Sequence, residues 1–179
     1  MSGAGGPAEP RRDMPRLTFR HPTEDDHRAL VDDIERWFQG RRMRPLFGRV
    51  WFAHFASTSW VAETTTDSRI AAILLGFASA DHPTDAVIHL AAVDPNLRRR
   101  GIGTAIHETW LAEMAVRGAT RAIVAVPPDE RVAILFFRSL GFAPEMAGTK
   151  FLWGVPAIED YDADGADRAL MARRIERAD

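Results

Sequence analysis

The sequence predicts a single α/β domain built around a mixed β-sheet. The apolar residues change period along the chain, from helical spacing to short strand-like runs. In the second half, strand-like and helix-like segments alternate. The length of 179 residues is typical of one domain, and the 46% of apolar residues suffice for a sizeable core. We expect residues 16–179 to form this domain, and residues 1–15, rich in Gly, Pro and charge, to be disordered.

The first third of the chain predicts a strand at 16–20 followed by two helices. Thr23 and Asp26 are spaced as in a capping box, at the start of a helix that we place within 21–40. The second helix is expected over 44–58, with proline in its first turn. Five aromatic residues of these helices are candidates for the core or for an apolar pocket: Trp37, Phe38, Phe47, Trp51 and Phe55.

The rest of the chain predicts two longer helices among strands. The mostly apolar runs 70–79 and 86–93 are typical of strands covered on both faces. Gly118 and Gly141 are placed to end the two helices. We expect strands at 59–64, 70–79, 86–93, 121–126, 142–145, 149–155 and 164–175, and helices at 101–117 and 131–141.

Composition excludes several classes of protein. The net charge of −2 and the sequence pI near 6.3 argue against general affinity for nucleic acid. The absence of cysteine excludes disulfides and a Cys-based zinc site, which fits a reducing compartment. No run approaches the ~18–20 apolar residues of a membrane span, and the start lacks the apolar stretch of a signal peptide. We expect a cytoplasmic protein without a metal, membrane or nucleic-acid partner.

The segment "VDPNLRRRGIGTAI", residues 93–106, combines a strand end with a helix start. Pro95 cannot continue a β-ladder because it has no N–H group. A helix then begins near Gly101, and the first turn of a helix carries unpaired N–H groups and the positive end of the helix dipole. Such an end binds phosphate well. Glycine at 101 and 103 allows close approach, Arg98 to Arg100 add positive charge, and Thr104 adds a hydroxyl.

Three phosphate-binding motifs compete for this segment. A P-loop would need Lys-Ser/Thr after the second glycine, which is absent. A dinucleotide fingerprint would need a third glycine where Ile106 stands, and an acid after the following strand, which ends without one. The pattern R-x-x-G-x-G after V-x-P fits at Val93, Pro95, Arg98, Gly101 and Gly103. A basic loop that binds nothing is the remaining alternative.

This pattern resembles the acetyl-CoA-binding motif of the GNAT superfamily of N-acetyltransferases, R/Q-x-x-G-x-G/A. The order of elements is also similar to that family. A second family motif, N-x-x-A-x-x-x-Y-x-x-x-G-F, resembles "ERVAILFFRSLGF" at Ala133, Gly141 and Phe142. The resemblance covers about residues 16–155, and the tail resembles that of bacterial members. It implies the GNAT fold: a mixed, twisted central sheet, splayed between its fourth and fifth strands and flanked by helices on both faces.

The resemblance also implies how acetyl-CoA is held. The exposed main chain of Ala91, Ala92 and Val93 would pair with the amides of pantetheine, as an added strand does. An N–H group near Val93 would stabilise the oxyanion of the tetrahedral intermediate. The pyrophosphate would bind the loop and helix start, which comprise Arg98, Arg99, Arg100, Gly101, Ile102, Gly103 and Thr104.

Acetyl transfer to an amine calls for a base, because a primary amine has a pKa near ~10 and must be neutral to attack. His89 is the leading candidate. It lies four residues before Val93 on one strand, so strand alternation predicts that both side chains face the same side. A core histidine is the alternative. Glu63, at the end of the strand 59–64, is the second candidate, and an ordinary strand-end charge is its alternative.

The sequence departs from the family at the general acid. The tyrosine that protonates the leaving thiolate in many members is replaced by Phe137, and the motif's asparagine by Glu130. The only tyrosine of the chain, Tyr161, lies in the tail. General acid help is typically worth ~10²–10⁴, so its loss slows catalysis without abolishing it.

The sequence therefore predicts an N-acyltransferase that moves an acetyl group from acetyl-CoA to a primary amine of a small molecule, by direct attack in a ternary complex. One alternative is a GNAT-fold enzyme that uses another acyl-CoA or a carrier-protein thioester, with an acyl carrier protein as partner. Another is a catalytically weak CoA-binding module, motivated by Phe137. A homodimer is a further expectation, because edge strands of this fold often pair.

Overall fold

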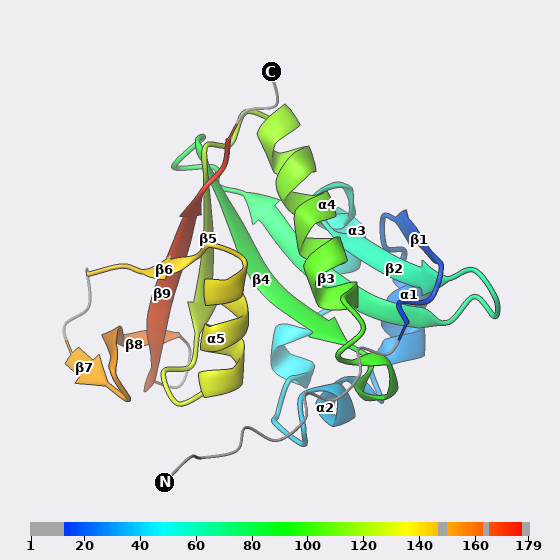
Figure 1. Ribbon diagram of the computed structural model, residues 1–179, viewed down its shortest axis with the longest axis horizontal. Coiled ribbons are helices and arrows are strands. Elements are labelled where there is room, and N and C mark those ends of the chain that lie inside the picture. Colours follow the sequence, from blue (N-terminus) through cyan, green and yellow to red (C-terminus); the bar gives the residue numbers. More distant parts are fainter. Residues whose placement is uncertain (1–12, 147–149, 163–164, 177–179) are drawn as a thin grey trace, which may run out of the picture.

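The computed structural model describes residues 13–146, 150–162 and 165–176. Within these residues, nine strands form one mixed sheet in the order β1-β2-β3-β4-β5-β9-β8-β7, with β6 also paired to β9 (Figure 1). In chain order they are β1 (Leu17–Arg20), β2 (Trp60–Thr64), β3 (Ile70–Ala78), β4 (Asp85–Val93), β5 (Arg121–Val126), β6 (Ala143–Pro144), β7 (Lys150–Leu152), β8 (Val155–Asp162) and β9 (Ala166–Arg174). The segment expected to be disordered lies mostly outside the described residues.

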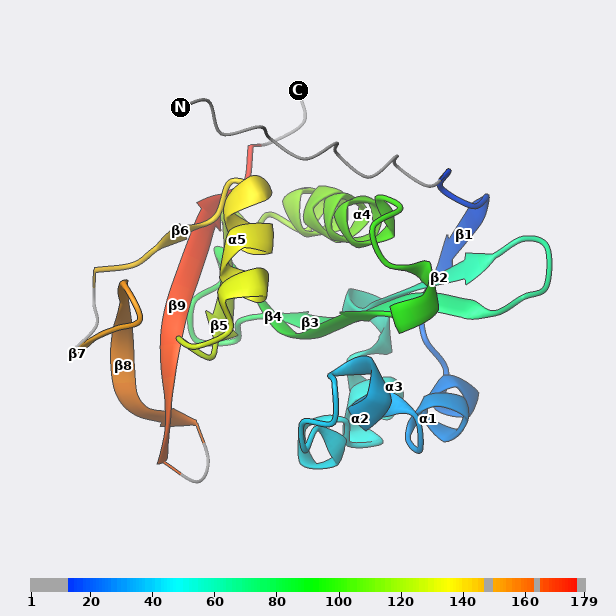
Figure 2. The same cartoon turned by 60° about the horizontal axis from the view of Figure 1, so that its bottom comes forward.

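Helices cover both faces of the sheet (Figure 2). The helices α4 (Ile102–Val116) and α5 (Arg131–Ser139) pack on one face, above a core that includes Trp110 and Met114. The other face carries α1 (Glu24–Leu30), α2 (Ile34–Trp37) and α3 (Val50–His54), together with the 3-10 turns η1 (Arg44–Leu46) and η2 (Ala56–Thr58). A third 3-10 turn, η3 (Pro95–Leu97), follows β4. No helix of the described residues is long and apolar enough to cross a membrane.

The sheet opens between β4 and β5. These parallel strands pair only over Asp85–Ile88 and Arg121–Val124, whereas β4 continues beside β3 as far as Val93. Figure 1 shows the two strands side by side at one end and apart at the other. The α/β fold with a mixed sheet splayed between its fourth and fifth strands is therefore confirmed. The splay leaves one edge of the second half of β4 without a neighbouring strand.

A β-bulge interrupts β4 in the middle of this sheet. Leu90 pairs with Leu75 and Ile88 pairs with Gly76, so two positions of β4 advance while β3 advances by one. His89 is the additional residue. Such a bulge shifts the alternation of all side chains that follow it.

The bulge makes one of our expectations wrong. His89 stacks on Trp51 of α3 and so faces the α1–α3 side. Val93, in contrast, packs with the core on the α4 side, as does Ala91. The two side chains predicted to share a face therefore lie on opposite faces.

Both helices predicted in the first third are interrupted, and the hydrophobic core explains the break in the second. The chain turns between α1 and α2, and again at Gly48 between η1 and α3. Phe47 and Phe52 are both buried in the α1–α3 core and meet edge to face, with ring centroids 5.1 Å apart. A continuous helix would separate residues five positions apart by more than one turn, so packing overrides helical periodicity here.

From Lys150 onward, where the described residues resume, the strand expected at 149–155 is instead the first strand and the turn of a β-hairpin. Strands β7 and β8 are joined by Trp153 and Gly154, whose φ angles are 52° and 83°. Two left-handed residues in a two-residue loop match the twist of paired strands. The predicted tail strand at 164–175 is confirmed as β9.

Candidate functional site

The open edge of β4 offers main-chain groups to the splay. The Asp94 N–H donates to the Ala71 carbonyl on β3 at 2.9 Å. Because main-chain groups alternate in direction along a strand, Ala91 and Val93 turn theirs away from β3, toward the gap. Of the three residues expected to bind pantetheine, Ala92 therefore directs its main-chain N–H and carbonyl groups toward β3 and away from the gap.

Arg98 was expected to add positive charge for the pyrophosphate, but its side chain binds main-chain carbonyls of the protein. Its Nε donates to the Val93 carbonyl at 3.3 Å, and its Nη2 donates to the carbonyl of Trp37 at the end of α2. The guanidinium thereby joins the end of β4 to the helices beneath the sheet. It positions the strand edge, and its side chain is already engaged by protein carbonyls.

Asp94 shapes the loop after β4, a role that we did not predict. Its carboxylate accepts from Asn96 N–H at 2.9 Å and from Arg69 Nη2 at 2.8 Å. The residue is only 3% exposed. The sequence signal was present, because an aspartate two residues before an N–H donor commonly closes a turn.

The loop then alternates in backbone handedness before α4 begins. Arg99 has a φ of 63° and Gly101, the N-cap, a φ of 83°. Left-handed residues next to right-handed ones turn successive N–H groups into a concave anion-binding surface. Arg100 contributes a buried Nε that has no hydrogen-bond partner among the described residues. This arrangement fits a pyrophosphate.

The first turn of α4 is packed closely against α5. A Cβ atom on Gly103 would lie 3.2 Å from the Phe136 ring and 3.5 Å from Val93 Cγ2. Ile102 is buried in the core, so it can offer only its N–H group to a ligand. Thr104 is half-buried. Glycine at 103 thus lets α5 approach the strand end, and glycine at 101 supplies the left-handed turn.

His89 is held in a defined orientation. Its ring stacks on Trp51 with centroids 3.8 Å apart, and its Nε2 bonds to the Leu46 carbonyl at 2.7 Å. Since a carbonyl only accepts, Nε2 carries the proton and Nδ1 keeps a lone pair. Burial lowers the pKa of His89, opposed by the Leu46 carbonyl and by the charge of Asp162. The neutral form therefore dominates at neutral pH.

Glu63 lies two strands away from β4. It faces Thr18 on β1, and its carboxylate accepts from Arg20 Nε at 2.8 Å. Arg20 also binds Asp26 at the start of α1. The structure therefore does not bring Glu63 together with His89, and the ion pair engages the carboxylate.

Phe137 belongs to the hydrophobic core. It is 7% exposed and packs edge to face against Phe142 and His107. His107 donates from Nδ1 to the Gly103 carbonyl at 2.7 Å, and its Nε2 is buried without a hydrogen-bond partner among the described residues. Burial lowers the pKa of His107 to about 4.

The site matches a known family in sequence. The model of the acetyltransferase (GNAT) family matches residues 21–142, which include the open strand, the loop and both flanking helices. The chain belongs to the GNAT acetyltransferase family. The family predicted from the motif is therefore confirmed.

Two curated relatives of this GNAT protein are named as N-acetyltransferases. An L-2,4-diaminobutyric acid acetyltransferase from Nocardia farcinica is 30% identical over 51% of this chain and 46% of its own. A [ribosomal protein bS18]-alanine N-acetyltransferase from Salmonella typhimurium is 33% identical over 44% of this chain and 51% of its own. This chain thus matches about half the length of each relative.

Solved GNAT structures share the fold. The diaminobutyrate acetyltransferase EctA from Paenibacillus lautus was solved with its substrate L-2,4-diaminobutyric acid and coenzyme A. It matches with a TM-score of 0.67 and 18% sequence identity, over 92% of this chain and 98% of its own. Within the residues described for this GNAT protein, no group of three or more His, Asp or Glu side chains is placed to hold a metal.

Proposed function

We propose that this GNAT protein transfers an acetyl group from acetyl-CoA to a primary amine of a small molecule, by direct attack in a ternary complex. One observation carries the acetyl-CoA part of the proposal: the open main-chain edge of β4 runs directly into the left-handed loop at the start of α4. A pantetheine arm and a pyrophosphate need these two features in this order.

The donor site would be made mostly of main chain. The main chain of Ala91 would pair with a pantetheine amide, and the N–H of Val93 would stabilise the oxyanion. The loop from Arg99 to Thr104 would hold the pyrophosphate, with Arg100 Nε as an additional donor. When bound, acetyl-CoA supplies a thioester whose carbonyl carbon accepts the amine.

His89 is the proposed base. Its Nδ1 lone pair can take the proton that the acceptor nitrogen must lose, directly or through one water. The depressed pKa keeps the imidazole unprotonated and ready at neutral pH. The ion pair of Glu63 with Arg20 favours a structural role for that carboxylate.

The leaving thiolate would take its proton from water. The ring of Phe137 has no proton to give and lies in the core. Tyr161 lies on β8 with nearly half of its surface exposed, and no described contact brings it to the loop after β4. A thiol with a pKa of about 8.5 leaves tolerably without an acid, so turnover should be modest.

Calorimetry with acetyl-CoA, longer acyl-CoAs and a carrier-protein thioester tests the donor. Thiol release with an amine panel then tests transfer; it should include diaminobutyrate and a peptide with N-terminal alanine. We expect acetyl-CoA to bind and a small amine to give thiol release. Binding without release for any acceptor would indicate a CoA-binding module. Preference for a longer acyl group or for the carrier protein would indicate another donor.

A further inference from the structure

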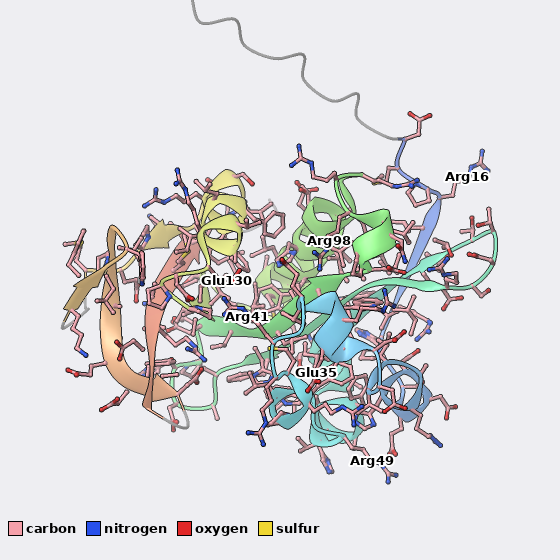
Figure 3. All side chains as sticks on the ribbon, turned by 90° about the horizontal axis from the view of Figure 1, so that it is seen from below. Arg16, Glu35, Arg41, Arg49, Arg98 and Glu130 are labelled. Atoms are coloured by element: carbon pink, nitrogen blue, oxygen red, sulfur yellow. The ribbon has the colours of Figure 1, made fainter. Side chains whose placement is uncertain are left out.

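An ion pair joins the two halves of the molecule across the splay. Arg41 follows α2, beneath the sheet, and its guanidinium binds the carboxylate of Glu130. The same guanidinium lies 3.5 Å from a carboxylate oxygen of Asp129. Figure 3 shows Arg41 and Glu130 directed toward each other, from the segment after α2 and from the start of α5.

The two ends of this pair are anchored to different strands. On one side, the Trp37 carbonyl at the end of α2 accepts from Arg98, which also binds Val93 at the end of β4. On the other side, Glu130 is the N-cap of α5, four residues after β5 ends. The pairing of β4 with β5 stops at Ile88 and Val124. The ion pair therefore links the segments that follow these two strands, beyond the last residues at which the strands pair.

We propose that Arg41 and Glu130, assisted by Asp129, form a latch over the pantetheine cleft that must open when CoA enters or leaves. The inference rests on the proposed function, because it assumes that the splay holds CoA. The carboxylate of Glu130 stands where the resembling family motif has asparagine.

Exposure sets the strength of the latch. The Arg41 side chain is 42% exposed and that of Glu130 is 29% exposed. Ion pairs this accessible to water are weak and screened by salt. Such a pair delays ligand exchange without preventing it, so its loss should change exchange rates by about two- to five-fold.

The test is stopped-flow dissociation of CoA from three variants. These are Arg41→Gln, the carboxylate variant Asp129→Asn/Glu130→Gln, and the combination of both. We expect each to release CoA about two- to five-fold faster than the wild type, and the combination to be no faster than either. Added salt should accelerate release from the wild type more than from the combined variant, which keeps only the salt dependence of the pyrophosphate contacts.

A simple electrostatic effect predicts a different pattern. If Arg41 only attracted the anionic cofactor, its loss would weaken binding while loss of the carboxylates would strengthen it, and the two effects would add. That result would overturn the latch. Arg36→Gln is the matched control. It removes a cation from α2, but the partner of that cation, Asp33, lies at the start of the same helix, so this ion pair does not cross the splay. We expect wild-type exchange from it.

Failure of the latch and failure of the proposed function give different results. Wild-type release rates in all three variants, with CoA bound normally, would overturn the latch alone. A wild-type protein that binds no CoA would overturn both. All of the substituted side chains are partly exposed, so thermal unfolding should stay within about 2 °C of the wild type.

Discussion

The imidazole of His89 lies nearly flat against the indole of Trp51, with the two planes 15° from parallel. Together with the Nε2 bond to Leu46, this contact fixes which nitrogen can act as a base. We expect His89→Ala to lower kcat by about 10²-fold, because general base help is typically of that size. CoA affinity, measured by calorimetry, should stay within about two-fold, since no proposed CoA contact involves the side chain.

The pH profile provides the specific readout for His89. Because burial lowers its pKa, kcat/KM should show an acid inflection below pH 6.5, where the imidazole becomes protonated. The inflection should disappear in His89→Ala. His82→Ala changes an exposed histidine in the turn before β4 and should keep it. A wild-type profile in His89→Ala would exclude His89 as the base.

His107 should make stability depend on pH. Its folded pKa of about 4 lies below the ordinary value of 6.5, so the unfolded chain binds the proton more tightly. The stability it contributes is present above pH 6.5 and is lost as pH falls toward 4, by about 3 kcal/mol. Urea unfolding at several pH values measures this loss, and His107→Leu should reduce the slope. An unchanged slope would mean that other groups carry the acid sensitivity.

Gly101 is required for its backbone conformation. A Cβ there would meet only Met14 Sδ, at 3.6 Å, which is an ordinary contact. The strain in Gly101→Ala therefore comes from the φ of 83° alone, and we expect it to lower the unfolding free energy by about 1 kcal/mol. It should also weaken CoA binding by at least about five-fold, because relaxation of φ turns the loop N–H groups away. Gly118→Ala, with a φ of 93° and nothing within 4 Å, should cost similar stability and leave CoA binding unchanged. Equal CoA affinity in both variants would remove the loop from the site.

Arg98 and Arg99 should differ although they are neighbours. Arg98→Ala leaves the carbonyls of Val93 and Trp37 without their donor, so we expect a loss of about 1–2 kcal/mol in unfolding free energy as well as weaker CoA binding. Arg99 is exposed, and Arg99→Ala should reduce CoA affinity at low salt with little change in stability. If Arg98→Ala unfolds like the wild type, the bridge to Trp37 contributes nothing.

The features that sequence predicted are those determined locally. The loop after β4 was predicted because proline ends a strand and glycine starts the next helix within a few residues of each other. The bulge at His89 was not, since it depends on how β4 aligns with β3. The breaks near Gly48 follow from two phenylalanine rings that must reach one core. The pairing of Arg41 with Asp129 joins positions 88 residues apart, which no local pattern reports.

The single extra residue in β4 has a consequence for how substrates meet. Without this residue, the side chain of His89 would lie on the same face of the sheet as that of Val93. The base would then compete with acetyl-CoA for the same space. With this residue, β4 offers its main-chain edge, and the loop before α4, to acetyl-CoA. The side chain of His89 points to the face of the sheet covered by α1 to α3. Under the proposed function, acetyl-CoA and the amine then approach the site from different sides of the sheet, so both can be bound at the same time. A one-residue irregularity thus favours sequential kinetics over a ping-pong scheme.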